Sequence, residues 1–210
     1  TLPTAPYGTD FNTQNTFTVD ESWYLDAKYA KTVAGNTDIV ARVYFDDYQY
    51  DGRYSYSGNI NKDTVHGQSY GSEITASKRF FDDKHRMTAG AEFVDNFKQE
   101  QRNEDLDPYN LILNSSETEQ KWSYFIQDEY TVTSWLTING GLCFDHSPNF
   151  GSLTNPRLAA ILKPRDGSTV KLIYGRALRP PNAYELYYED GVFTQRPDHL
   201  DPERNTSYEA

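Results

Sequence analysis

The residues of this 210-residue sequence best suited to metal binding or acid–base chemistry are its carboxylates, four histidines and one cysteine. The histidines show no paired spacing of the kind that zinc sites use. Asp46-Asp47 and Asp82-Asp83 lack the spacing of an EF-hand loop and suit strand ends and turns better than calcium ligands. No G-x-S-x-G nucleophile motif is present. The sequence therefore predicts no catalytic, metal or cofactor site, and no enzyme. The histidines are His66, His85, His146 and His199.

The composition limits the classes of partner that the protein can bind. The formal net charge is −11 and the sequence pI is about 4.7, which argues against nucleic acid as a partner because nucleic-acid binding needs clustered Lys and Arg. Seventeen tyrosines stand against one methionine at a mean hydropathy of −0.80. Tyrosine has an apolar body and a polar tip, so this composition fits both a soluble Tyr-rich β-domain and a β-barrel with a polar lumen. Cys143 alone permits no internal disulfide.

Alternating apolar and polar residues predict an all-β chain of eight long strands and the start of a ninth. Residues 1–21 carry no sustained period and are interpreted as a loop. No run of about 18 apolar residues predicts a membrane-spanning helix. No signal-peptide pattern opens the chain, so it is either cytoplasmic or its front end is missing. The predicted strands are 22–33, 37–50, 68–80, 85–97, 121–133, 136–146, 155–163, 169–177 and a start at 206.

The predicted connections alternate in length. Antiparallel strands place alternate connections at opposite ends of a sheet, so short turns would gather at one end and long loops at the other. Outer-membrane barrels have this arrangement, with short periplasmic turns and long extracellular loops. The predicted strands also exceed the five or six residues common in globular proteins. The connections in order are 34–36, 51–67, 81–84, 98–120, 134–135, 147–154, 164–168 and 178–204.

The two-residue period also predicts which side chains face lipid and which face the lumen of such a barrel. Leu25, Ile39, Val43, Ala89, Phe93, Ile126, Leu142, Leu158 and Leu172 are predicted to face lipid. Lys28, Arg42, Glu92, Gln127 and Lys171 are predicted to face the lumen.

The stretch 169–209 carries a family resemblance. Its spaced elements resemble, in order, a segment typical of TonB-dependent outer-membrane receptors, with Leu178 and Asn182 as mild departures. Residues 124–145 resemble a second segment of that family and place a turn at Ser134-Trp135. Asn139-Gly140 would otherwise be a strong hairpin signal. The matching elements are Tyr174-Gly175-Arg176-Ala177, Arg179-Pro180-Pro181, Glu185-Leu186, Leu200-Asp201-Pro202-Glu203 and Tyr208-Glu209.

The resemblance implies an antiparallel transmembrane β-barrel of 22 strands, filled by an N-terminal plug and located in the bacterial outer membrane. Residues 1–210 would be one part of that barrel domain, with 1–21 a remnant of an extracellular loop and 22–210 strands and loops. The plug, the segment that contacts TonB and the closing C-terminal strands would be missing. The implied partners are the TonB complex through the missing N-terminal region, a ferric siderophore or related iron complex, and lipopolysaccharide.

Other functions stay open from the sequence. The chain could belong to an outer-membrane receptor for cobalamin or carbohydrate, or form a soluble secreted β-rich binding module. An outer-membrane enzyme barrel would need a catalytic constellation that the sequence does not show. The acidic cluster Glu185, Glu189 and Asp190 suits a solvated loop, or a loop that meets ligand or lipopolysaccharide-bound divalent ions, better than a catalytic pair.

Aromatic and arginine side chains in the expected extracellular loops are candidate ligand contacts. Arginine could clamp an anionic ligand in a bidentate manner. For Arg176 and Arg179 we favour the alternative, in which they lie at the membrane rim or pair with lumen carboxylates. The candidate contacts are Tyr54, Tyr56, Tyr109, Arg179, Tyr184, Tyr187 and Tyr188.

Overall fold

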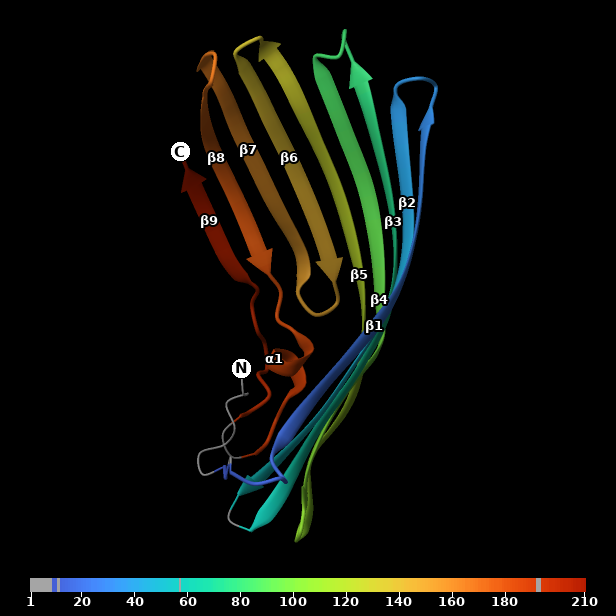
Figure 1. Ribbon diagram of the computed structural model, residues 1–210, viewed down its shortest axis with the longest axis vertical. Helices are drawn as coiled ribbons and strands as arrows, with labels where there is room; N and C mark the ends of the chain where they lie inside the picture. Colours follow the sequence, from blue (N-terminus) through green and yellow to red (C-terminus); the bar gives the residue numbers. More distant parts are fainter. Residues whose placement is uncertain (1–8, 11, 57, 192–193) are drawn as a thin grey trace.

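The computed structural model describes residues 9–10, 12–56, 58–191 and 194–210, which form one antiparallel sheet with its strands in sequence order (Figure 1). Each strand pairs with the next, and the sheet is open, with β1 and β9 at its edges. The strands are β1 (Phe17–Val33), β2 (Thr37–Tyr56), β3 (Asn59–Phe80), β4 (His85–Leu106), β5 (Tyr109–Thr133), β6 (Leu136–Ser147), β7 (Gly151–Arg165), β8 (Ser168–Arg179) and β9 (Glu203–Glu209).

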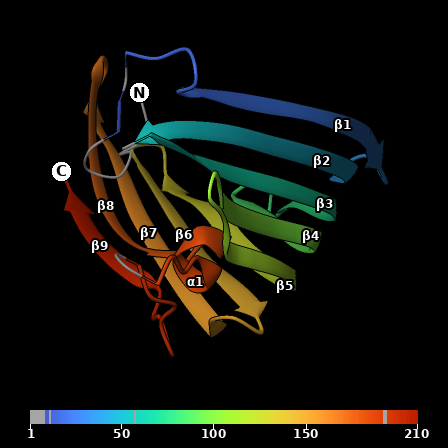
Figure 2. The same cartoon turned by 90° about the horizontal axis from the view of Figure 1, so that it is seen from below.

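The sheet is bent into an arc from β1 to β9 (Figure 2). One short helix, α1 (Ala183–Tyr187), lies in the connection between β8 and β9. In the described part of the chain, no helix is long and apolar enough to cross a membrane. The predicted all-β antiparallel fold is confirmed, including the short ninth strand.

The sheet has two faces, which we define by α1: the inner face carries α1 and the outer face is the opposite one. Residues directly opposite one another on paired strands share a face. On the outer face one such row joins five strands through Ile39, Ala76, Ala89, Ile126 and Leu142. The predicted apolar positions lie on this face, and six of the nine are large side chains that are exposed: Leu25, Val43, Ile126, Leu142, Leu158 and Leu172. The predicted division of the two faces is confirmed.

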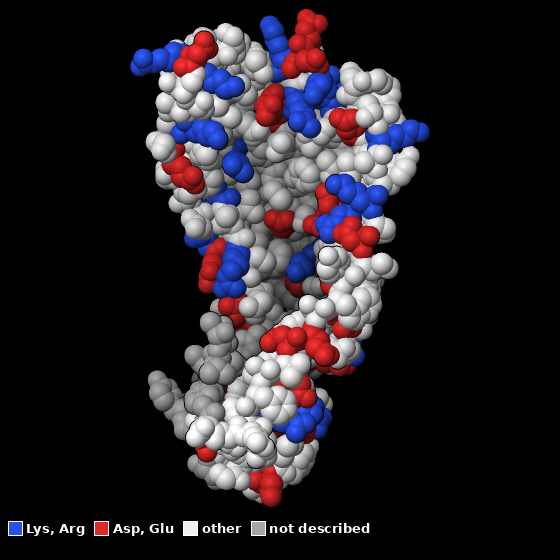
Figure 3. All heavy atoms as spheres, viewed as in Figure 1, with Lys and Arg blue, Asp and Glu red and all other residues white. Residues whose placement is uncertain are grey.

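The inner face is polar and crowded. Arg42 pairs across the sheet with Glu73, and Glu73 with Glu92. The Tyr44 hydroxyl donates to Glu92 Oε1 at 2.8 Å, which bridges two strands over Gly71. In Figure 3, which takes the view of Figure 1, a hollow runs down the middle and acidic and basic side chains are interspersed around it. This hollow is the surface toward which the inner-face side chains project.

Two predicted loops are wrong. Residues 51–67 and 98–120 were expected to be loops, but β2 and β3 run to residues 56 and 59, and β4 and β5 run to residues 106 and 109. Both stretches form paired strands with polar side chains on both faces. An alternation of apolar and polar residues, which is the sequence signal of a strand, is therefore missing from them. Similarly, β1 begins at Phe17 inside the predicted loop 1–21, and β7 begins at Gly151 rather than at residue 155. Residues 1–8 and 11 lie outside the described residues.

The turns at the opposite end match the sequence well. Residues 34–36, 81–84 and 134–135 separate strands as predicted. Ala34 and Gly35 have φ angles of 49° and 74°, which fits the tight turn. Asn139 and Gly140 lie inside β6, paired with Glu129 and Asp128 of β5, so the choice of the turn at Ser134-Trp135 is confirmed.

Two aromatic groups bound the apolar part of the outer face. Near the middle of the sheet lie Trp23, Phe45, Tyr70, Phe93, Phe97 and Trp122, linked by ring contacts such as Phe93–Trp122 at 4.4 Å. Toward the short turns, His85 stacks on Tyr130 at 4.1 Å and contacts Phe81. Trp122 and Tyr130 are eight residues apart on β5, roughly 26 Å along the strand at about 3.3 Å per residue. For a strand tilted by about 40° in a barrel, this corresponds to a height of roughly 20 Å. Membrane barrels carry an apolar band about 25 Å tall between aromatic girdles.

The packing of Tyr44 over Gly71 gives a first prediction. A Cβ atom on Gly71 would overlap the Tyr44 ring, and its three nearest atoms all belong to Tyr44. Gly71→Ala should therefore lower the free energy of unfolding in detergent by about 1–3 kcal/mol, the usual cost of overpacking. Adding Tyr44→Ala should recover part of that loss, because the overlapping ring is gone. If the double variant lost more free energy of unfolding than the two single variants lose together, this packing would be contradicted.

Candidate functional site

The connection between β8 and β9 folds back onto the inner face. Pro180 and Pro181 end β8 because proline removes a backbone donor from the ladder. Asn182 then caps α1: its side-chain oxygen accepts from the Glu185 amide at 2.9 Å, and Glu185 Oε2 accepts from the Asn182 amide at 2.9 Å. This reciprocal capping box starts α1 directly after the two prolines.

Arg179 ties both ends of this connection together. Its guanidinium donates to both carboxylate oxygens of Glu185 at 2.9 and 3.0 Å, and to both of Glu203 at 2.7 and 3.0 Å. Glu185 belongs to α1 and Glu203 begins β9, so a single side chain fixes the start of the helix against the return strand. Bidentate arginine–carboxylate pairs are strong and fix the relative orientation of the two groups.

The sheet holds α1 through side chains of β4. Gln101 Nε2 donates to the Ala183 carbonyl at 2.9 Å, and Asn103 Nδ2 donates to the Tyr188 hydroxyl at 3.0 Å. Gln101 and Asn103 are both buried. On the other side of the helix, the Tyr187 hydroxyl donates to Asn149 Oδ1 at 3.1 Å. These bonds bring the β8–β9 connection, β4 and the β6–β7 turn into one surface.

A cluster of tyrosines surrounds Asp63 on this surface. Asp63 lies opposite Gly52 of β2 and Asn103 of β4. The hydroxyls of Tyr50 and Tyr54 contact each other, and the Tyr50 ring lies over Gly52. We define the inner-face cluster as Asp63 with Tyr50, Tyr54, Asn61, Asn103, Tyr184 and Tyr188.

Burial controls the electrostatics of the inner-face cluster. It raises the pKa of Asp63 to about 6, and hydrogen bonding to Asn103 only partly offsets the effect. Asp63 Oδ1 is buried without a hydrogen-bond partner in the described part of the chain. Burial likewise raises the pKa of Tyr188, with the nearby Asp63 carboxylate adding to the shift. The cluster therefore offers phenol and amide groups for hydrogen bonding, beside a carboxyl group that titrates near neutral pH.

The structure brings three of the seven predicted contacts together and places the other four elsewhere. Tyr54, Tyr184 and Tyr188 belong to the inner-face cluster, whereas Tyr187 faces Asn149 and stacks under Arg196 at 5.0 Å. Arg179 forms the clamp described above. Tyr56 donates to Asp105 Oδ1 at 2.7 Å, near the far end of β2. Tyr109 is 63% exposed at the start of β5, apart from the cluster.

Sequence reasoning missed Asp63, Gln101 and Asn103. All three fall in stretches predicted to be loops, where no strand phase could be assigned. The sequence feature that could have indicated them is the spacing of Gln101 and Asn103, which lie two residues apart and therefore on one face of β4. That spacing has meaning only once the strand is known to continue to Leu106.

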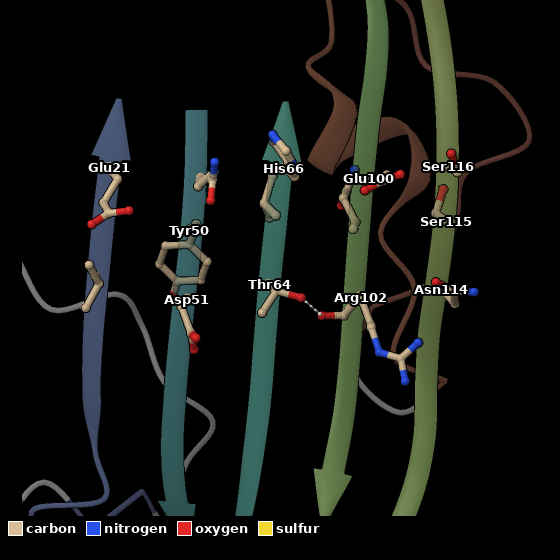
Figure 4. Close-up of a pocket in the computed structure, with 14 residues that line it drawn as sticks. Glu21, Tyr50, Asp51, Thr64, His66, Glu100, Arg102, Asn114, Ser115 and Ser116 are labelled. Carbon is tan, nitrogen blue, oxygen red and sulfur yellow. Dashed lines mark hydrogen bonds between the residues drawn. The ribbon is translucent and has the colours of Figure 1, made fainter. Parts of the chain in front are cut away.

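A second recess lies on the outer face. It has a volume of about 710 Å³ and is lined by side chains of β1 to β5 (Figure 4). A smaller pocket of about 200 Å³ lies near Phe150, Leu153, Leu178 and Pro180. Among the residues that the structure describes, no group of three or more His, Cys, Asp or Glu side chains is placed to hold a metal ion.

The comparisons with known proteins identify the family. The sequence model described as "TonB dependent receptor-like, beta-barrel" matches residues 2–210. This chain belongs to the β-barrel family of TonB-dependent receptors. No curated protein matches the chain in sequence.

Solved structures share the fold at low identity. The copper transporter OprC is 16% identical with a TM-score of 0.69, over 88% of this chain and 36% of that one. The ferric citrate transporter FecA is 9% identical with a TM-score of 0.65, over 91% and 32%. The siderophore receptor PirA from Pseudomonas aeruginosa is 16% identical with a TM-score of 0.56, over 90% and 41%. The chain thus spans about a third of the length of these structures.

The Arg179 clamp gives a second prediction. Arg179→Ala should speed amide hydrogen exchange in residues 180–191 of the β8–β9 connection by at least about tenfold. A helix as short as α1 depends on contacts with the rest of the protein for its stability. Arg176→Ala on the same strand is the matched control and should leave exchange in that segment unchanged. Equal exchange in both variants would show that the clamp does not hold the connection.

The raised pKa of Asp63 gives a third prediction. Because the folded protein holds this proton up to about pH 6 and an unfolded chain only to about 3.8, stability should fall as pH rises from about 4 to 6. Two pKa units correspond to at most about 3 kcal/mol. Asp63→Asn should remove this slope from urea unfolding in detergent, whereas Asp166→Asn in the exposed β7–β8 turn should keep it. A wild-type slope in Asp63→Asn would contradict the assignment.

Proposed function

We propose that this chain forms part of the barrel wall of an outer-membrane receptor that takes up a scarce nutrient, with energy supplied through TonB. The observation that carries the proposal is the β8–β9 connection, folded inward and bonded to the inner face through Gln101 and Asn103. This contact supports a lumen-side position for the inner-face cluster, where a captured cargo would sit. Family membership supports this receptor over a soluble secreted binding module.

The outer face supports location in the bacterial outer membrane. Its apolar band lies between two aromatic groups, as in membrane barrels, and its height of roughly 20 Å is close to their value of about 25 Å. The extended parts of β2 to β5 would then project on the extracellular side, and the turns at 34–36, 81–84, 134–135 and 166–167 would lie in the periplasm. With this orientation, the inner-face cluster lines an extracellular vestibule.

We infer that the cargo is a ferric siderophore or a related iron complex. The phenol and amide groups of the inner-face cluster can hydrogen-bond the oxygen atoms that surround iron in such complexes. Of the similar structures named above, one is described as a ferric citrate transporter, one as a siderophore receptor and one as a copper transporter. A peptide importer, RagAB, also shares the fold at 16% identity with a TM-score of 0.59 over 93% of this chain and 28% of that one. Cobalamin and carbohydrate are the alternatives that the uptake test must include.

The cargo is tested by uptake into cells that carry the complete receptor. Radiolabelled ferric siderophores, ferric citrate, cobalamin and an oligosaccharide are supplied in turn, with and without functional TonB. We expect TonB-dependent uptake of a ferric complex. A double Tyr54→Ala, Tyr188→Ala variant should weaken the apparent affinity at least about tenfold, and the distant Tyr109→Ala should not. Uptake of cobalamin or oligosaccharide alone would overturn the iron proposal, and uptake without TonB would overturn the energy source.

The sidedness gives a fourth prediction, measured by cysteine labelling on intact cells after Cys143→Ser. Asn110→Cys lies beside the β4–β5 turn and Asp166→Cys lies between β7 and β8, and both positions are exposed. An impermeant maleimide should label residue 110 on intact cells, and residue 166 only after the outer membrane is opened. The reverse pattern would invert the topology.

A further inference from the structure

Two tyrosines of β2 bring their hydroxyl groups to one side of Asp63. Gly52 pairs with Asp63 across β2 and β3, and the Tyr50 ring lies over this glycine, where a Cβ atom would overlap it. Tyr54 is four residues farther along β2, and its hydroxyl contacts that of Tyr50. Both phenol groups therefore meet beside the Asp63 carboxyl group.

Strand β4 and the β8–β9 connection supply the other side. Asn103 of β4 is the second partner of Asp63 in the sheet, and it donates to the Tyr188 hydroxyl at 3.0 Å. The Tyr188 ring is buried and stacks on the Tyr184 ring at 4.4 Å, whereas Tyr184 is 53% exposed. Tyr184 is therefore the ring of the inner-face cluster that is most open to a ligand.

The inner-face cluster contains a carboxyl group and no cation. Asp63 makes no ion pair with any residue that the structure describes, and its Oδ1 atom is buried without a hydrogen-bond partner there. The nearest cations along the two strands are Arg53 and Lys62, which pair with each other in the next row. Because neighbouring residues of a strand point to opposite faces, both of these cations lie on the outer face.

Other carboxylates add to the negative charge around the tyrosines. Burial raises the pKa of Tyr184, and the charges of Asp63 and Asp190 raise it further. Burial also raises the pKa of Tyr54, and Asp63 and Asp20 add to that shift. Among the described residues, no cation offsets these charges at either ring. The cluster should therefore attract a cationic group and repel an anionic one.

A primary ammonium group fits this arrangement. It carries three N–H donors and no acceptor, which suits an unpartnered carboxylate oxygen beside phenol oxygens. Its hydrogen bond to a carboxylate is charge-assisted and so stronger than a bond between neutral groups. Its charge is also attracted to the face of a tyrosine ring. A carboxylate beside an exposed tyrosine ring can therefore bind an ammonium group through both contacts.

We propose that the inner-face cluster binds a primary ammonium group on the cargo, with Asp63 as the counter-ion and Tyr184 as the exposed aromatic contact. The cargo would then be a ferric chelate with a positively charged end rather than an anionic chelate. The inference rests on the proposed function, because it assigns a charge to the iron complex that the same surface captures.

Three ferric trihydroxamate chelates that differ only at one end test this charge preference. The first ends in a primary amine, the second in the acetylated amine and the third in the succinylated amine, so their ends are positive, neutral and negative. Each is titrated by calorimetry into the complete receptor in detergent at about pH 7.5, where a carboxyl group whose pKa burial raises to about 6 is ionised.

We expect the amine chelate to bind at least about tenfold more tightly than the acetylated chelate, and the succinylated chelate to bind most weakly. Equal affinities for the amine and acetylated chelates would overturn the proposal. Tightest binding of the succinylated chelate would also overturn it, because the site would then prefer an anion.

Substitution of Asp63 tests whether its charge causes the preference. Asp63→Asn keeps the size of the side chain and removes the charge, so the amine and acetylated chelates should bind within about twofold of each other. Asp51→Asn is the matched control and should keep the preference. Asp51 pairs with Thr64, the neighbour of Asp63, and so lies at a similar depth on the opposite face (Figure 4). A preference that persists in Asp63→Asn, folded as judged by gel mobility before and after boiling, would refute the assignment.

Tyr184 tests the aromatic contact separately, at an exposed position. Tyr184→Leu should reduce the preference for the amine chelate about threefold, because the ring face is lost. Tyr184→Phe keeps the ring and should keep the preference. An unchanged preference in Tyr184→Leu would refute the aromatic part of the proposal.

Two further probes separate the ammonium site from the iron cargo: pentylamine and a tripeptide that contains lysine. Binding of pentylamine that depends on Asp63, in a receptor that imports no iron complex, would refute the iron proposal and leave the ammonium site standing. TonB-dependent uptake of the amine and acetylated chelates with equal apparent affinity would refute the ammonium site alone. Binding of the tripeptide that depends on Asp63 and is tighter than binding of the amine chelate would keep the ammonium site and refute iron as the cargo.

Discussion

Backbone hydrogen bonding is the constraint on which this structure depends. In hydrocarbon an unpaired N–H or C=O group costs several kcal/mol, so a spanning chain must pair every strand with a neighbour. Strands β2 to β8 meet this demand on both sides through a continuous antiparallel ladder, and β1 and β9 meet it on one side each. The ladder also fixes register, and register puts Ile126 beside Ala89 and Leu142 on one face while Gln127 lies on the other. Apolar wall and polar lumen follow from the same pairing.

The same ladder continues beyond the apolar band and creates two different surfaces there. The inner one is crowded, because the β8–β9 connection is held by the Arg179 clamp and by Gln101 and Asn103. The outer one is open and polar, and it carries ion pairs within the sheet such as Lys98–Glu100 and Arg102–Glu104. Alternation along β4 separates them, with Glu100 and Arg102 outward and Gln101 and Asn103 inward. One set of strands thus presents two different polar surfaces, one on each face of the sheet.

Strands and turns were predicted correctly from the sequence where one face of the strand is apolar, and were missed where both faces are polar. The phase of Leu136, Ile138, Leu142 and Phe144 was enough to place the turn at Ser134-Trp135 and keep Asn139-Gly140 inside β6. Residues 51–67 and 98–120 have no apolar face, so their strands could not be distinguished from loops. Tyr54 and Tyr188 were named as candidate contacts by residue type, and the structure puts both in the inner-face cluster. Asp63 and Asn103 needed the register, because only cross-strand pairing brings them together.

The central claim is that alternate residues of one strand face lipid and lumen, and arginine substitution at two adjacent positions tests it most directly. Ile126→Arg and Gln127→Arg are compared in the complete receptor by urea unfolding from lipid vesicles. Ile126→Arg should lower the free energy of unfolding by about 2–4 kcal/mol, the cost of a charge on the lipid face near mid-depth. Gln127→Arg should cost under about 1 kcal/mol, because the lumen is wet. Equal costs, or a larger cost at residue 127, would contradict the account.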